Sequence, residues 1–416
     1  MRIRLQSRPA KFLVVTVTVV LLAPYCIIAG GRYRAARVAE KDDRASLERA
    51  IAMQPNDAAY RERLARYLLY VDQDAPAALH NYRIASAQNP YSSSDWLGIA
   101  QAQLILGDEP ASLEATQRAI EADPTTPSVA WEAANLFITN GQIDPALREI
   151  RFVLANDSSM LLQGLRLVHR LEPSAPKAVE AGLPPDPKIY LTFITMLSQE
   201  GKVNEAKAVW PLLMGLHQQF DPKLTLYFLH ELTQSGDAKT ALQFWNDLGK
   251  RFTEINRLNQ PGNLIHNSSF EYDILNGGFD WEFLSSREVD LRTETSDAHD
   301  GRRSLLVTFL GERTSDIGMH QYLVLEPNTR YRFRGYMKSA LQTANGLQFI
   351  LVDVANQKRL LETSDSVDDR QWKEFSADFV TAPNTRLCVF LMGRSGGTLV
   401  RGNALIDDLH LEKVTE

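Results

Sequence analysis

The chain has 416 residues, which is more than one hydrophobic core usually holds, so we expect several domains. Its composition, 44% hydrophobic and 23% charged, is that of ordinary folded protein. The net charge of −6 and the pI of about 5.8 exclude a general electrostatic attraction to nucleic acid, so we expect no nucleic-acid partner.

The first predicted element is an uncharged apolar stretch at residues 12–31. It is as long as the roughly 20 residues that a helix needs to cross a bilayer. A helix is the single segment that satisfies its own backbone in lipid, and Pro24 would kink it. We therefore expect a transmembrane anchor after a cytoplasmic tail, residues 1–11. Residues 32–416 would lie on the periplasmic side of a bacterial inner membrane.

Two alternatives to an uncleaved anchor stay open. Ala29-Gly30-Gly31 would end a cleaved signal peptide, and Cys26 would carry the lipid of a lipoprotein, although Tyr25 is large for the residue before such a site. Arginine and lysine residues flank both sides of the stretch, so charge alone does not fix its orientation.

From Asp42 to about Phe252 the sequence indicates pairs of helices, and its first part is periodic. Pro55, Pro90 and Pro124 follow acidic or amide-rich helix ends at spacings of 35 and 34 residues. This pattern resembles the tetratricopeptide repeat over residues 42–158. The resemblance implies stacked helix pairs whose concave face binds an extended peptide or a partner protein.

The period breaks at residues 159–186, where a proline-rich stretch predicts an irregular connector. Further helix pairs are expected at residues 187–258. Trp210 and Trp245 occupy positions where aromatic rings of repeats usually pack between helices, so we interpret them as packing residues.

After Gln260-Pro261-Gly262 the pattern changes from helical to alternating, with turn signals such as Asp300-Gly301 between segments of strand length. This predicts an antiparallel β-sandwich at residues 263–414. The expected strands lie at residues 303–309, 321–325, 330–337, 348–354, 374–380 and 386–391.

Four motifs in this part resemble, in order and spacing, the galactose-binding-like jelly rolls, in particular carbohydrate-binding modules of the 4/9 type. They are NLIHNSSFE, AHDGRRSLLVTF, YLVLEPNTRYRFRGYMKS and ALIDDLHLEKV, which begin at Asn263, Ala298, Tyr322 and Ala404. The fold class predicted for the chain is therefore a transmembrane helix, an all-α repeat array and an all-β jelly-roll sandwich.

The resemblance implies a structural calcium ion between the first strand, the Asp-Gly loop and the last strand. The matching residues are Glu271, Asp300, Ser304, Asp407 and Asp408. Carboxylate and carbonyl oxygens are the ligands that calcium prefers. The alternative is a solvated Asp407-Asp408 pair, with Glu271 bound to an arginine.

The resemblance also implies sugar binding by aromatic rings that stack on the apolar faces of pyranoses. The candidates are Trp281, Phe283, Tyr322, Tyr336 and Trp372. Each of them also fits core or rim packing, and domains of this fold bind protein as well as sugar.

No motif indicates catalysis. Gly393-Arg394-Ser395-Gly396-Gly397 satisfies the G-x-S-x-G pattern, but turn and strand residues follow it where a nucleophile elbow needs a helix. The eight histidines show no HExxH spacing, and Cys26 and Cys388 are poorly placed for a disulfide. A glycanase would need two placed carboxylates, and no predicted domain is left to supply them. We expect the chain not to be an enzyme.

The sequence therefore predicts a membrane-anchored binding or scaffold protein of the cell envelope. Its repeats would dock a protein partner and its sandwich would bind a polysaccharide, as suits exopolysaccharide synthesis or export. The alternative is a purely protein-binding assembly factor whose sandwich is structural.

Overall fold

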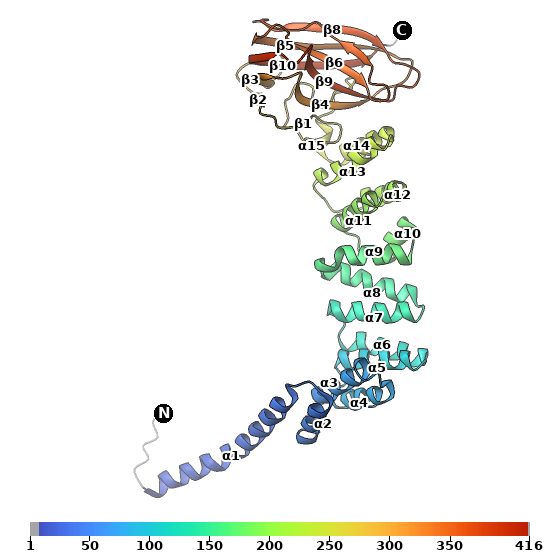
Figure 1. Ribbon diagram of the computed structural model, residues 1–416, viewed down its shortest axis with the longest axis vertical. Coiled ribbons are helices and arrows are strands. Elements are labelled where there is room, and N and C mark those ends of the chain that lie inside the picture. Colours follow the sequence, from blue (N-terminus) through green and yellow to red (C-terminus); the bar gives the residue numbers. More distant parts are fainter. Residues whose placement is uncertain (1–7, 415–416) are drawn as a thin grey trace. The chain divides into compact units, whose positions relative to one another are not determined.

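The computed structural model describes residues 8–414 and divides the chain into two compact units, one ending at Pro185 and one beginning at Asp186 (Figure 1). The first unit begins with helix α1, Arg8–Ala39, which contains Pro24. By length and composition α1 could cross a membrane, and a signal sequence would pass the same test. Of the predicted cytoplasmic tail, residues 1–11, residues 1–7 lie outside the described residues and residues 8–11 belong to α1.

The end of α1 packs into the helical array. Ala35 and Ala39 are fully buried in one core cluster with Leu47 and Ala50 of the next helix. The Arg63 guanidinium donates a hydrogen bond of 2.7 Å to the Ala39 carbonyl oxygen and so fixes this end of the helix.

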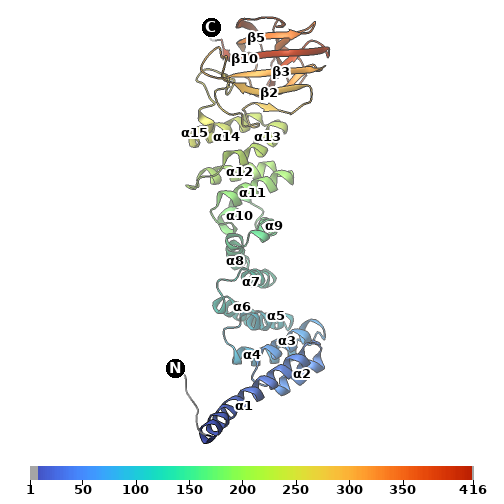
Figure 2. The ribbon, with the colours of Figure 1, turned by 90° about the vertical axis from the view of Figure 1, so that its left-hand side faces the viewer.

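The helices that follow form pairs in chain order (Figure 2). Small residues let paired axes approach closely, and aspartates such as Asp74 and Asp108 cap helix N-termini through backbone N–H groups. Alanines at the contacts, among them Ala78, Ala100 and Ala133, are fully buried. The first pair is α1 with α2 (Arg44–Met53). The next three pairs are α3 (Ala58–Tyr70) with α4 (Ala75–Gln88), α5 (Ser93–Ile105) with α6 (Glu109–Ala122), and α7 (Pro127–Thr139) with α8 (Ile143–Asn156).

The prediction of an irregular connector at residues 159–186 is wrong. This segment contains η1 (Ser158–Met160), α9 (Leu161–Leu171) and α10 (Ala175–Gly182). Its Pro176 lies in the first turn of α10, where the missing N–H costs no helical hydrogen bond. Gly182 allows close packing, since a Cβ there would lie 2.7 Å from a Val168 methyl carbon.

The second unit begins with further helices, as expected. They are α11 (Pro187–Gln199), α12 (Val203–Met214), η2 (Pro222–Thr225), α13 (Leu226–Gln234), α14 (Ala238–Arg251) and α15 (Thr253–Asn256). Trp210 and Trp245 are buried, which confirms them as packing residues, and Trp210 stacks on Phe244 at 4.5 Å between ring centroids.

The β domain is a sandwich of two five-stranded antiparallel sheets, as predicted. Sheet A has the order β1-β4-β9-β6-β7 and sheet B the order β2-β3-β10-β5-β8. Inward residues such as Phe333, Phe349 and Phe390 form one core between them. The strands are β1 (Glu282–Phe283), β2 (Val289–Glu294), β3 (Ser304–Arg313), β4 (Asp316–Val324), β5 (Arg330–Gln342), β6 (Leu347–Asp353), β7 (Arg359–Glu362), β8 (Lys373–Val380), β9 (Leu387–Arg394) and β10 (Leu399–Lys413).

Helices α13 and α14 pack directly against the sandwich. The Trp245 ring contacts His266 and Phe279, at 5.8 and 6.3 Å between ring centroids. Gly278 makes room for it, because a Cβ there would lie 2.6 Å from the indole. At the edge of sheet A, the Gln234 side-chain amide donates a hydrogen bond of 3.0 Å to the Tyr322 hydroxyl. The second unit therefore joins helices and sandwich through a buried contact.

We predict that Trp245→Ala destabilises this contact by about 3–5 kcal/mol, because it leaves a large cavity between α14 and the sandwich. Hydrogen exchange of the full chain should show faster exchange at residues 263–283 and in β4. Leu224→Ala is the control, since that side chain is 56% exposed. Equal exchange in both variants would contradict a contact that stabilises the sandwich.

Candidate functional site

The structure places the five predicted aromatic residues in different environments. Trp281 is fully buried, with its ring 5.4 Å from Phe270 and 5.9 Å from Phe390 between centroids. Its indole N–H donates a hydrogen bond of 3.2 Å to the Asn267 carbonyl oxygen. The prediction that Trp281 stacks on sugar is therefore wrong, because no ligand reaches this ring without unfolding the core.

Phe283 and Tyr322 lie at sheet A. Phe283 is partly buried against the sandwich core, and its strand partner is the buried Met319, so it packs at the rim. Tyr322 belongs to the outward positions of β4, where its hydroxyl accepts from Gln234 and its ring meets His320 edge-on at 5.2 Å. These two residues do not form a common aromatic platform.

Tyr336 and Trp372 meet at sheet B, on the outward side of β5 and just before β8. The His299 imidazole joins them: it stacks on Tyr336 at 3.6 Å and meets Trp372 edge-on at 5.9 Å between ring centroids. The Tyr336 hydroxyl donates a hydrogen bond of 2.9 Å to Glu374, which raises the pKa of the phenol. Two of the five predicted residues thus lie together, with a histidine between them.

Beside these rings lies a cavity of about 300 Å³. Leu306, Ala340 and Leu405 contribute apolar surface to it, and polar side chains line the rest. We name it the loop pocket, because Asp297 of the β2–β3 loop lines it together with Glu294, Lys338, Arg370 and Asn403.

Asp297 connects the loop pocket to the aromatic residues. Its carboxylate accepts hydrogen bonds from the Lys338 ammonium group and, at 3.0 Å, from the Trp372 indole N–H. The Lys338 contact holds the pKa of Asp297 below its ordinary value. An ionised acid and an ammonium group therefore line the loop pocket, and the Trp372 indole is held beside it by its bond to the acid.

Two carboxylates from the ends of the β domain hold the loop in place. Glu271 accepts backbone N–H bonds from Arg302 and Arg303 at 2.7 and 2.8 Å. Asp407 accepts from His299 and Asp300 at 2.7 and 3.0 Å, and burial raises its pKa to about 6.

Gly301 is required at the turn of this loop. It has φ +68°, and a Cβ there would lie 2.4 Å from a Glu271 carboxylate oxygen. The motif D-G-x-x-S is thus a loop whose N–H groups surround carboxylates.

The residues predicted for calcium belong to the Asp-Gly loop or contact it, and their groups are already bonded to protein groups. Asp408 lies 3.5 Å from the His299 imidazole, and the Ser304 hydroxyl donates to the Asp297 carbonyl oxygen at 2.7 Å. Asp300 contributes its backbone N–H to Asp407. Within residues 8–414, no group of three or more acidic, histidine or cysteine side chains is arranged to hold a metal ion. Calcium would therefore depend on Glu271, Asp407 and backbone carbonyls.

The G-x-S-x-G segment lies between two strands. β9 ends at Arg394 in sheet A and β10 begins at Leu399 in sheet B, so Ser395 lies in a loop that crosses between the sheets. The expectation of a hairpin here is wrong, because these two strands do not pair, but a strand and not a helix follows the motif, as expected. The Arg394 guanidinium is buried and bonds the carbonyl oxygens of Thr314, Asn345 and Thr398, which is a structural role.

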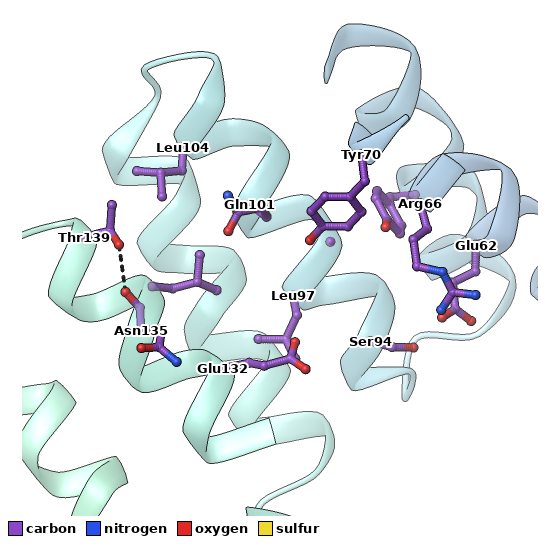
Figure 3. A pocket seen from close by; sticks show the side chains of 13 residues that line it. Glu62, Arg66, Tyr70, Ser94, Leu97, Gln101, Leu104, Glu132, Asn135 and Thr139 are labelled. Atoms are coloured by element: carbon purple, nitrogen blue, oxygen red, sulfur yellow. Dashed lines mark hydrogen bonds between the residues drawn. The ribbon is translucent and has the colours of Figure 1, made fainter. Parts of the chain in front are cut away.

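A second candidate site is a groove in the first unit with a volume of about 460 Å³ (Figure 3). Helices α3, α5 and α7 line it, that is, the first helix of three successive pairs. We name it the repeat groove; its polar residues include Glu62, Arg66, Tyr70, Gln101, Glu132 and Asn135.

Comparison with known proteins finds a family match in the β domain. Residues 262–391 match the family described as "Carbohydrate binding domain", of the 4/9 type, as the motifs indicate. No curated protein gives a significant match.

Three similar solved structures illustrate the two parts. A xylan-binding domain from Paenibacillus barcinonensis is 18% identical, covers 36% of this chain and 93% of its own, and has a TM-score of 0.26. A CBM61 domain in complex with β-1,4-galactotriose is 17% identical, covers 36% and 99%, and has a TM-score of 0.28. The TPR protein YrrB, described as having an unusual peptide-binding site, is 15% identical, covers 48% and 89%, and has a TM-score of 0.24.

Sequence reasoning missed Asp297, His299 and Lys338 as members of the sandwich site. Lys338 had a usable signal, because alternation along β5 places it on the same face as Tyr336. His299 and Asp297 had no such signal in the sequence, because it is the folding of the β2–β3 loop that brings them to Tyr336 and Trp372.

Proposed function

We propose that this chain is a membrane-anchored, non-enzymatic binding protein of the cell envelope, serving exopolysaccharide synthesis or export. Its sandwich binds polysaccharide and its repeats dock a protein partner. The match of residues 262–391 to a carbohydrate-binding family carries this proposal.

The loop pocket has the chemistry that a sugar needs. Trp372 and Tyr336 do not line the pocket but lie beside it, where Trp372 donates to Asp297. They offer ring surface for the apolar face of a pyranose, Tyr336 on the face that His299 does not cover. Asp297, Lys338 and Asn403 offer acceptors and donors for hydroxyl groups, next to an apolar floor. The hydrogen bonds of Asp297 to Lys338 and Trp372 hold these groups in place before a ligand arrives.

The end of α1 supports an uncleaved anchor. One continuous helix runs from the apolar residues to Ala39, and its last turns belong to the core of the array. Cleavage after Gly31 would cut inside this helix.

We predict that Trp372→Ala weakens polysaccharide binding by at least about tenfold, equivalent to about 1.4 kcal/mol. The measurement is affinity electrophoresis or calorimetry of the full chain in detergent, against a panel of bacterial and plant polysaccharides. Tyr322→Ala is the matched control, because that ring lies on the other sheet.

Each outcome of this test is informative. Loss of polysaccharide binding in Tyr322→Ala, with binding unchanged in Trp372→Ala, would place the site on sheet A. No binding to any polysaccharide, together with a protein partner recovered through residues 42–258, would favour the assembly factor with a structural sandwich.

We predict that the anchor stays on the mature protein, so the chain remains in the membrane fraction after alkaline extraction. Leu21→Arg should release part of it, since arginine near the centre of a span costs about 2.5–3.5 kcal/mol. Leu162→Arg is the control, because Leu162 is an exposed residue of α9. A mature N-terminus near residue 32, found by mass spectrometry, would contradict the anchor.

We propose further that calcium binds at the β2–β3 loop through Glu271, Asp407 and loop carbonyls. Calcium should then raise the melting temperature of the sandwich relative to a chelator, because an ion bound only by the folded state stabilises it. Glu271→Gln keeps an oxygen that accepts N–H groups and removes the charge, so it should abolish the shift. Identical melting with calcium and with chelator would mean that the N–H contacts alone hold the loop.

A further inference from the structure

The repeat groove carries an excess of acidic side chains. Glu62 of α3 and Glu132 of α7 line it, whereas Arg66 is the one basic residue among those that line it in the described part of the chain. Among residues 8–414 no ion pair joins Glu62 or Glu132 to a basic side chain, although Arg66 lies one helical turn after Glu62 in the same groove. Asp95 of α5 is 1% exposed and does not line the groove, and burial raises its pKa to about 6.

The floor of the groove presents a buried hydroxyl group. Tyr82 of α4 lines the groove although it is only 3% exposed. Its ring fits under α5 because residue 98 is glycine: a Cβ there would lie 2.3 Å from the ring. No hydrogen bond to its hydroxyl is found among residues 8–414. Burial raises the pKa of Tyr82, so the group is protonated and can donate to a ligand.

An exposed aromatic ring stands at the opening. Tyr70 is 63% exposed and projects into the groove, with Gln101 facing it from α5 (Figure 3). Glu132 lines the same groove, and partial burial and the charge of Glu132 raise the pKa of Tyr70. A π face with carboxylates around it is the environment that binds an organic cation.

We propose that the repeat groove binds an extended segment of a partner protein through a lysine or arginine side chain. The cation lies over Tyr70 between Glu62 and Glu132, and the Tyr82 hydroxyl donates to a carbonyl oxygen of the segment. Gln101 and Asn135 supply amides for the peptide backbone. This inference rests on the proposed docking of a protein partner by the repeats and adds the charge of that partner.

Peptide binding to the full chain in detergent tests the inference. The probes are labelled peptides of equal length in which alanine alternates with lysine, glutamate or glutamine. The lysine peptide should bind at least about tenfold more tightly than the other two. Its affinity should fall when salt is raised from about 50 to about 300 mM, because the contact is electrostatic and near the surface.

Substitutions assign the binding to the groove. The double variant Glu62→Gln, Glu132→Gln should weaken the lysine peptide at least about tenfold. Glu121→Gln, an exposed acid of α6 outside the groove, should not change it. Arg66→Gln should leave binding unchanged or tighten it, because it removes the opposing cation.

The inference and the docking proposal fail in different ways. Preferential binding of the glutamate peptide, with loss through Arg66→Gln, would overturn the basic partner and keep the docking. A partner protein that is cross-linked in cells in equal yield to the wild type and to the double variant would also overturn the basic partner, because docking then occurs outside the groove. No peptide binding and no cross-linked partner would reject both. Self-association that the double variant abolishes would identify a second copy as the occupant and overturn the partner proposed here.

Discussion

The candidate sugar site depends on two carboxylates that bind the backbone N–H groups of one loop. Glu271 and Asp407 come from opposite ends of the β domain, and both hold residues 299–303. Hydrogen bonds to charged groups are stronger than those between neutral groups. This loop contains His299, and Asp297 lies two residues before it. The same four hydrogen bonds therefore determine the positions of the His299 ring, which stacks on Tyr336, and of the Asp297 carboxylate in the loop pocket. The contacts that join the two ends of the β domain therefore also position the residues of its candidate site.

The sequence predicted the sandwich better than its site. Alternation and the four motifs are local patterns, and strands follow from them directly. Which ring is accessible depends on register and on the covering segments. Trp281 follows a stretch without regular structure, so no periodicity indicated that its indole would turn inward onto Phe270. The predicted connector is wrong for a related reason: proline usually ends a helix, but Pro176 lies in the first turn of α10, where it is tolerated.

The repeat groove shows a signal that the sequence did contain. Glu62, Leu97 and Glu132 lie 35 residues apart, and they occupy the same position in three successive pairs. Buried alanines set the stacking that brings these positions to one surface. Comparing equivalent positions across repeats would have found the groove. The space beneath Gly98 that the Tyr82 ring occupies depends on how the helices pack, so only the structure shows it.

Helices α13 and α14 also cover part of the edge of sheet A. β1 pairs only with Met319 and His320 of β4, so the remaining residues of β4 have no strand beside them on that side. Such an unpaired edge is a template for pairing with another chain. Here α14 lies against β4, and Gln234 of α13 is bonded to Tyr322. Helices α13 and α14 therefore cover an edge at which chains could otherwise pair and aggregate. A fragment that begins after α14 would expose this edge of β4.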